Sequence, residues 1–196
     1  PYIGLVSDGR NHFTHTHDSS QLYRFGDSNP YVEAFFAWWQ SSLSRTLKEL
    51  RLTGGEPLMS GETWRLLDWF KSNDTDMRFA LNSNLGAKDE LITKLIDASH
   101  SIKHFHLYTS NESMGPQAEY IRDGLEWNKW LENVDRVLSQ GRIEGFHVMC
   151  TINALCLDTL DKFLDCMLNW KRKYGKDFPT FTLNILRFPS FQSPLV

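Results

Sequence analysis

The regular alternation of helical and extended patterns from about residue 30 onward constrains the fold more than any other feature. Apolar residues recur at helical spacing in one segment and form short β-type runs in the next, with roughly 30 residues per strand–helix unit. Helices are expected over about 30–43, 64–70, 88–99, 127–139 and 157–174, and strands over about 49–52, 77–81, 104–108, 144–151 and 180–186. This order predicts an α/β fold in which parallel strands are joined by right-handed helical crossovers, either an open doubly wound sheet or part of a barrel.

The first 28 residues differ from the rest because they are polar, rich in histidine and only weakly periodic. We interpret 1–28 as a loop region that precedes a single α/β domain over 29–196. This region contains a group of side chains of the kind that bind metals, namely His12, His15, His17 and Asp18. No partner ligands are evident for such a set, and a flexible histidine-rich loop is the favoured interpretation.

Composition excludes several classes of function. The chain has 196 residues with 21 basic and 24 acidic side chains, which gives a net charge of −3 and no basic face for nucleic acid. No apolar run approaches the roughly 20 residues that span a bilayer. The start shows no basic region followed by an apolar stretch, so no signal peptide is expected. Three cysteines without a CxxC spacing argue against a disulfide framework and favour a reducing, cytoplasmic setting.

Ligands of parallel α/β folds bind at the carboxyl ends of the strands, so we examined those five places. The first is Thr53-Gly54-Gly55-Glu56-Pro57, directly after a strand and before a helix. Two glycines allow the backbone to approach a ligand, Glu56 adds an acceptor for a cation, and Pro57 ends the strand. The alternative interpretation is a plain tight turn.

The remaining strand ends are also polar. Asn82-Ser83-Asn84 ends the second strand, and Tyr108-Thr109-Ser110-Asn111-Glu112 ends the third, where hydroxyls and a carboxylate suit the hydroxyls of a ribose. Both can equally be polar turns. Arg122 in the long connection is a candidate carboxylate clamp, or a surface ion pair with Asp123 or Glu119. Asn153 at the fourth strand end needs a partner, either a ligand or the backbone.

Together these segments resemble the radical S-adenosylmethionine (radical SAM) superfamily. Leu52-Thr53-Gly54-Gly55-Glu56-Pro57-Leu58 is similar to the GGEP motif of that family, Asn82-Ser83-Asn84 to its third strand end, and Ser110 to its fourth. The stretch Glu119-Tyr120-Ile121-Arg122-Asp123-Gly124 is similar to members with a twitch extension. The resemblance runs from about residue 30 to the end and implies a partial TIM-like (βα)6 barrel with strands two to six of six.

The chain departs from the family in one respect. The family is defined by CxxxCxxC, whose three thiolates hold a four-iron four-sulfur cluster. Cys150, Cys156 and Cys166 are six and ten residues apart and do not match this spacing, so they are interpreted as structural. The simplest account is that the sequence is the middle of a longer protein, cut after the cluster loop. The rival account is a degenerate relative that has lost the cluster.

The resemblance implies cofactors and roles for named residues. The parent protein would cleave S-adenosylmethionine at the cluster to a 5′-deoxyadenosyl radical, with a reductase as electron donor and a peptide as the guessed substrate. Gly54, Gly55 and Glu56 would hold the amino group of the cofactor, Ser110 its ribose or carboxylate, and Arg122 a carboxylate; Pro57, Asn82, Asn84 and Asn153 would complete the pocket. Two alternatives stay open: a non-catalytic barrel domain that binds a nucleoside or peptide, and an unrelated α/β enzyme acting on a phosphorylated metabolite, although Glu56 argues against phosphate.

Overall fold

The computed structural model describes residues 2–7, 13–17, 29–175 and 177–195. The chain divides into two compact units, Pro1–Thr46 and Leu47–Val196. In the described part of the first unit, β1 (Tyr2–Ser7) pairs antiparallel with β2 (Phe13–His17). Three helical segments follow: α1 (Pro30–Trp38), the π-helix η2 (Trp39–Leu43) and α2 (Ser44–Thr46).

The strand pair corrects part of the sequence interpretation, which treated 1–28 as loop. Phe13-Thr14-His15-Thr16-His17 contains β-branched threonines, which favour strands. Its polarity does not prevent pairing, because a strand pair satisfies backbone groups whatever the side chains are. His12 and Asp18 lie outside the described residues. As the sequence predicts, helix α1 begins at Pro30, and the Asn29 side chain accepts from the Tyr31 backbone N–H at 3.0 Å.

The second unit is built on a five-stranded parallel sheet in the order β3-β4-β5-β6-β7. Its strands are β3 (Glu49–Leu52), β4 (Arg78–Asn82), β5 (His104–Ser110), β6 (Gly145–Ile152) and β7 (Thr180–Ile185). Its α-helices are α3 (Gly61–Ser72), α4 (Asp89–Ser99), α5 (Gly115–Ile121), α6 (Trp127–Gln140) and α7 (Leu157–Tyr174). Short 3₁₀ turns are η3 (Pro57–Met59), η4 (Ala154–Cys156) and η5 (Ser190–Gln192).

Sequential parallel strands with helical crossovers confirm the predicted α/β fold class, and the arrangement is consistent with a partial TIM-like barrel. Every predicted strand and helix from residue 30 onward is present. The short helix α5 was not predicted, because the sequence there indicates only a long connection. Among the described residues, none of the helices is both long enough and apolar enough to cross a membrane.

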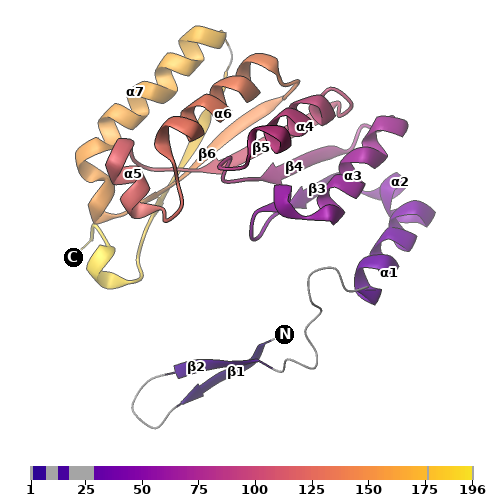
Figure 1. Ribbon diagram of the computed structural model, residues 1–196, viewed down its shortest axis with the longest axis horizontal. Coiled ribbons are helices and arrows are strands. Elements are labelled where there is room, and N and C mark those ends of the chain that lie inside the picture. The colour runs from indigo at the N-terminus through magenta and orange to yellow at the C-terminus, as the bar shows by residue number, and fades with distance from the viewer. Residues whose placement is uncertain (1, 8–12, 18–28, 176, 196) are drawn as a thin grey trace. The chain divides into compact units, whose positions relative to one another are not determined.

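Helices α3, α4, α6 and α7 lie on the same face of the sheet (Figure 1). Strand side chains that point to this face are buried, namely Phe79, Leu81, Phe105, Leu107, Phe146 and Val148. The helices contribute a matching set of buried side chains: Leu67, Phe70, Ile92, Leu95, Trp130, Val134 and Phe163. Each such side chain contributes roughly 1.5–3 kcal/mol when it leaves water, so this layer is the core of the unit.

The other face of the sheet is polar. In β5, the buried residues Phe105, Leu107 and Thr109 alternate with the partly exposed His104, His106, Tyr108 and Ser110. Strand register brings side chains from β3, β4, β6 and β7 beside them: Glu49, Arg51, Arg78, Asn82, His147, Met149 and Thr180. We call this surface the polar face.

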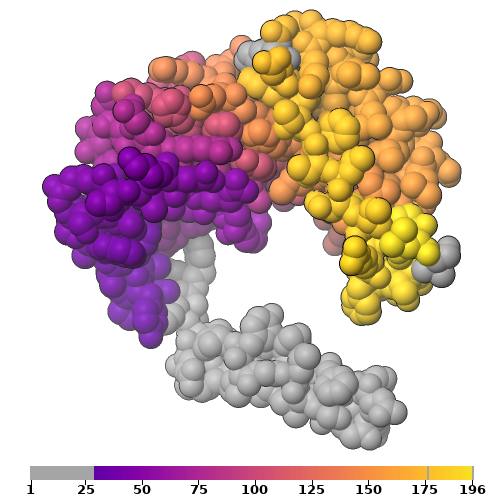
Figure 2. Space-filling view, turned by 180° about the vertical axis from the view of Figure 1, so that it is seen from behind, coloured from indigo at the N-terminus to yellow at the C-terminus, as the bar shows by residue number. Residues whose placement is uncertain are grey.

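The C-terminal end of the unit leaves apolar side chains on the surface. Phe181, Leu183 and Ile185 of β7 are about half exposed, at 44%, 56% and 51%. The segment that follows β7 lies at the surface, in yellow in Figure 2. Its two phenylalanines, Phe188 and Phe191, are strongly exposed.

Candidate functional site

The turn after β3 is open on the side of its two glycines. Gly54 and Gly55 have φ values of +89° and +50°, a conformation that glycine adopts without strain. A Cβ atom built on either glycine meets no heavy atom within 4 Å. The backbone of this turn therefore faces open space, as a ligand-binding turn requires. The chain then enters the 3₁₀ turn η3 at Pro57, which is buried.

Glu56 ties this turn to the end of the neighbouring strand β4. Its Oε1 accepts from the Leu58 backbone N–H at 3.1 Å and from the Ser83 hydroxyl at 2.8 Å. Its Oε2 accepts from the Asn84 backbone N–H at 2.7 Å. Because a carboxylate has about four acceptor positions, roughly one remains for a ligand donor. Glu56 is thus held in place before any ligand arrives.

The end of β4 contains one acceptor with no partner. Asn84 accepts from the Gly86 backbone N–H through Oδ1 at 2.8 Å, so its side chain stabilises its own turn. Asn82 lies on the polar face in register with Tyr108. The Oδ1 atom of Asn82 is buried and has no hydrogen-bond partner among the described residues. A buried acceptor of this kind costs about 1–3 kcal/mol, so this place suits a ligand donor.

The third strand end contains a buried ion pair. Ser110 is the last residue of β5, and Glu112, which follows it closely, is only 2% exposed. Arg122, at the end of α5, donates from Nη2 to Glu112 Oε2. The sequence left Asp123 and Glu119 as possible partners of Arg122, and the structure gives Glu112 instead. The carboxylate that Arg122 binds here therefore belongs to the protein itself.

Asn153 follows the fourth strand end and is buried. Its Oδ1 accepts from the Leu155 backbone N–H at 2.9 Å, and its amide donates to the Thr151 carbonyl at 3.2 Å. Asn153 is also the N-cap of the 3₁₀ turn η4. The sequence left two kinds of partner open for Asn153, a ligand or the backbone. The structure shows that the backbone supplies them.

The three cysteines do not suit an iron–sulfur cluster. Burial, with the nearby Glu112 carboxylate adding to it, raises the pKa of Cys150 to about 12. Burial also raises the pKa of Cys156, and it raises that of Cys166 to about 11. Among the described residues, no group of three or more potential metal ligands occurs.

The structure brings some of the predicted site residues together and leaves others apart. Glu56 contacts the Ser83-Asn84 turn directly, which joins the first two strand ends into one unit. Arg122 joins Glu112 in a second unit at the third strand end. Asn153 forms its own local cap. The residues of this carboxyl edge are therefore organised as separate, internally bonded turns on one parallel sheet.

Sequence reasoning named Asn82, Tyr108 and Ser110 of the polar face but missed its arginines and histidines. Arg51, Arg78, Tyr108, His106 and His147 form a hydrogen-bonded layer there. The period-two pattern His104-Phe105-His106-Leu107-Tyr108 was the available signal, since it marks a strand with one polar face. The arginines come from strands about 30 to 60 residues earlier, and only the strand register places them beside it.

Comparisons with known proteins give distant structural likeness alone. No protein-family model and no curated protein matches the chain. A similar solved structure is that of a domain of pyruvate-formate lyase-activating enzyme from Bacteroides vulgatus, with 12% identity and a TM-score of 0.46. The match covers 69% of this chain and 98% of that one. A likeness of this degree identifies neither the family nor the function of the chain.

Proposed function

We propose that the carboxyl edge of the sheet binds S-adenosylmethionine and that the chain is the barrel core of a radical SAM enzyme. The observation that carries the proposal is the Thr53–Pro57 turn: two open glycines with positive φ, followed by a carboxylate fixed between two strand ends. An ammonium group donates hydrogen bonds and carries positive charge, so this turn suits the amino group of the cofactor.

The residues present fit S-adenosylmethionine in part. Glu56 keeps about one acceptor position for the amino group, and the glycine backbone is open beside it. Asn82 offers a buried acceptor, and Ser110 offers a hydroxyl at the next strand end. Arg122 is engaged with Glu112, so a ligand carboxylate would have to share the guanidinium with that side chain. Pro57, Asn84 and Asn153 act by holding the shape of their turns.

The chain's own cysteines do not fit the cluster of the family. A four-iron four-sulfur cluster beside the cofactor would supply radical chemistry, with one electron from a reductase, while Glu56 and the glycine turn would hold the amino group of S-adenosylmethionine. Thiolate ligands for that cluster would have to come from outside this sequence. The part played by the described residues is to bind the cofactor, orient it and exclude water from it.

A second function is favoured by the chemistry of the cysteines. Cys150 and Cys156 are buried and Cys166 is half-buried, and among the described residues no group of three potential metal ligands occurs. A barrel that binds a nucleoside or peptide without radical chemistry needs no such group. Both functions use the same carboxyl edge of the sheet as the binding pocket. They differ only in whether an iron–sulfur cluster is bound beside it.

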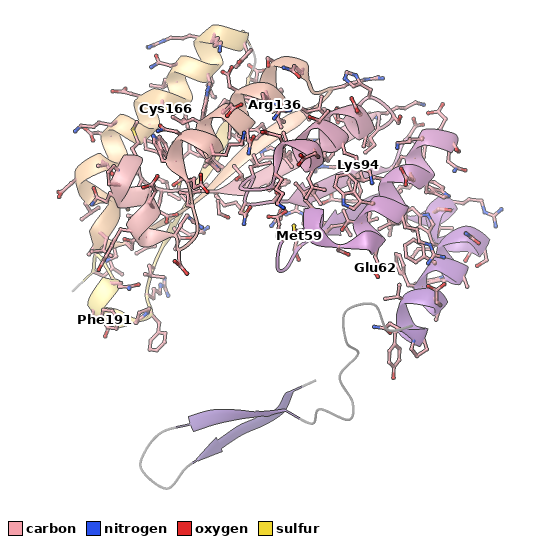
Figure 3. All side chains as sticks on the ribbon, viewed as in Figure 1. Met59, Glu62, Lys94, Arg136, Cys166 and Phe191 are labelled. Atoms are coloured by element: carbon pink, nitrogen blue, oxygen red, sulfur yellow. The ribbon has the colours of Figure 1, made fainter. Side chains whose placement is uncertain are left out.

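Calorimetry with the 196-residue chain tests the shared binding step. Saturable heat is expected on titration with S-adenosylmethionine, and Glu56→Gln should weaken binding at least about tenfold, since it removes a charged acceptor. Glu62→Gln is the matched control, because Glu62 is an exposed glutamate at the start of α3 (Figure 3). Ser110→Ala tests the ribose or carboxylate contact without disturbing the Glu56 ties. Equal affinity in all four proteins would refute the assigned site.

The radical step needs a separate experiment on a longer reading frame. A protein with upstream CxxxCxxC would be purified without oxygen, reconstituted with iron and sulfide, and assayed for 5′-deoxyadenosine with dithionite. Formation that depends on Glu56 supports the enzyme. Binding of S-adenosylmethionine without any cleavage, in a protein that lacks such cysteines, supports the non-catalytic alternative.

A further inference from the structure

The polar face carries a cluster of cationic and aromatic side chains that the proposed cofactor site does not use. Arg51 on β3 and Arg78 on β4 each donate from Nη2 to the Tyr108 hydroxyl on β5, both at 3.2 Å. The Arg51 guanidinium lies 4.5 Å from the centroid of the Tyr108 ring. That ring stacks on His147 of β6, with centroids 4.4 Å apart. We call Arg51, Arg78 and Tyr108 the arginine–tyrosine cluster.

Hydrogen bonding assigns a neutral state to His106 and makes Nε2 of His147 a donor to it. Arg78 Nη2 lies 3.3 Å from His106 Nδ1, and a guanidinium can only donate, so Nδ1 is the acceptor. The proton of His106 is then on Nε2, 3.3 Å from the Glu144 carboxylate. His147 Nε2 lies 3.0 Å from the same His106 Nδ1 and therefore donates to it. His147 Nδ1 lies 2.6 Å from the Thr180 hydroxyl.

The pKa values of the two histidines agree with this assignment. Burial, followed by the charge of Arg78, lowers the pKa of His106. Burial, followed by His106 and the two arginines, lowers the pKa of His147 to about 4. At neutral pH the positive charge of the layer therefore belongs to Arg51 and Arg78.

Hydrogen-bond donors exceed acceptors around the two guanidinium groups. The carboxylate of Glu49 lies 3.2 Å from Arg51 and 3.5 Å from Arg78, so two cations share one anion. The Nε–H of Arg78 is buried and has no hydrogen-bond acceptor among the described residues. The Tyr108 oxygen accepts from both arginines, so its own proton is available to another acceptor. A surplus of donors and of positive charge favours an anionic ligand.

Solvent can reach the cluster. The side chains of Arg51 and Arg78 are 42% and 38% exposed. Their guanidinium planes present paired N–H groups, a geometry that matches two oxygens of a carboxylate or phosphate.

We infer that the arginine–tyrosine cluster binds an anionic oxygen group, a carboxylate or a phosphate, of a small molecule on the polar face. Arg51 and Arg78 bind its oxygens, and the Tyr108 hydroxyl donates to it. The site uses different residues from the proposed cofactor site and stands on its own contacts.

NMR titration of the 196-residue chain with inorganic phosphate, and separately with acetate, tests this inference. Ionic strength is held constant with chloride at pH 7, where both histidines are neutral. The side-chain signals of Arg51, Arg78 and Tyr108 should shift and saturate with a dissociation constant of about millimolar order. Tighter binding of phosphate identifies a phosphate ligand, and tighter binding of acetate identifies a carboxylate; either result supports the site.

Variants separate a specific site from general charge attraction. Arg51→Gln should weaken binding about tenfold or more, and Tyr108→Phe should weaken it less, because that change keeps the ring stack. Arg136→Gln is the control, since Arg136 lies on α6 among the helices, where it pairs with Asp89 (Figure 3). If Arg51→Gln does not fold, Arg51→Lys keeps the charge and removes the paired N–H groups.

Two results would overturn the inference. One is a shift that stays linear with both anions in the unaltered protein. The other is equal affinity of the Arg51→Gln and Arg136→Gln variants for the anion. If Arg51→Gln does not fold, the corresponding result is equal affinity of Arg51→Lys and the unaltered protein. Calorimetry with S-adenosylmethionine on the same samples reports separately on the proposed cofactor site, so either proposal can fail without the other.

Discussion

The turns at the carboxyl edge and the polar face belong to one sheet but satisfy their polar groups in opposite ways. In the turns, carboxylates meet donors from the chain itself, as Glu56 does with three such groups and Glu112 does with Arg122. On the polar face, Arg51 and Arg78 have more donors than the surrounding acceptors can use. The carboxylates of the edge are therefore held by donors of the chain itself, although Asn82 Oδ1 and Arg122 Nε have no partner among the described residues. On the polar face the unmatched groups are donors of two neighbouring arginines, which are left to solvent or a ligand.

If this difference holds, a substitution in the Glu112–Arg122 ion pair should have the largest effect on the free energy of unfolding. Arg122→Met removes the partner of a carboxylate that is 2% exposed, so the free energy of unfolding should fall by about 2–4 kcal/mol. Urea denaturation measures this change. Arg172→Met on the exposed side of α7 is the control and should alter it by less than about 0.5 kcal/mol.

The double variant Glu112→Gln with Arg122→Met sharpens this result. It removes the unpaired charge, so it should recover part of the lost stability. A single Arg122→Met variant as stable as the unaltered protein would show that Glu112 does not depend on this ion pair.

Loss of the hydrogen bonds that Glu56 accepts should have the next largest effect on the free energy of unfolding. Glu56→Ala frees the backbone N–H groups of Leu58 and Asn84 and the hydroxyl of Ser83. Because these groups are only partly buried, we expect the free energy of unfolding to fall by about 1–2 kcal/mol. Hydrogen exchange of the Asn84 amide should also become faster. Unchanged exchange in this variant would argue against the tie between the two strand ends.

Acid should weaken the polar face. The pKa of folded His147 is about 4, and that of His106 is also lowered, so the unfolded chain binds protons first as the pH falls. Stability should therefore decrease between about pH 6.5 and pH 4, by about 1–2 kcal/mol after allowance for partial exposure.

The free energy of unfolding, measured against pH for a His147 variant, isolates the contribution of this histidine. His147→Gln should flatten the dependence in this pH range. An identical slope in the unaltered protein and His147→Gln would contradict the neutral state assigned to His147.

Loss of the Tyr108 hydroxyl should have the smallest effect on folding. Tyr108→Phe keeps the ring stacked between strands and removes one acceptor, and the exposed guanidinium groups can turn to water. The free energy of unfolding should change by less than about 1 kcal/mol. A much larger loss, measured by urea denaturation, would mean that the polar groups of this face depend on bonds within the chain as strongly as those of the carboxyl edge do.

Local patterns predicted the elements of the fold, and they could not predict most contacts of the site. Periodicity was enough for the strands and helices from residue 30 onward, because each pattern reports which face of an element is buried. Helix α5 is only seven residues long, too short for a periodic signal beside Gly115 and Pro116. The partner of Arg122 depends on how α5 folds back onto the end of β5, which spacing alone does not encode.

The polar-face layer illustrates the same limit. Arg51 and Tyr108 are 57 positions apart in the sequence, and the parallel register of β3, β4 and β5 brings them together. The turn around Gly54 was easier to find, because its motif lies within five consecutive residues, whereas the bonds from Glu56 to Ser83 and Asn84 were not predicted. Sites made by one turn can be predicted from sequence, whereas sites made across strands need the structure.

The most direct test of the central claim is an NMR map of S-adenosylmethionine binding to this chain. We expect saturable shifts of backbone amide signals that concentrate at Gly54, Gly55, Asn84 and Ser110, the turns that the structure holds at the carboxyl edge. The last turns of helix α7, far along the helix from this edge, should keep their signals. Absence of saturable shifts, or shifts centred on α6 and α7, would contradict the account.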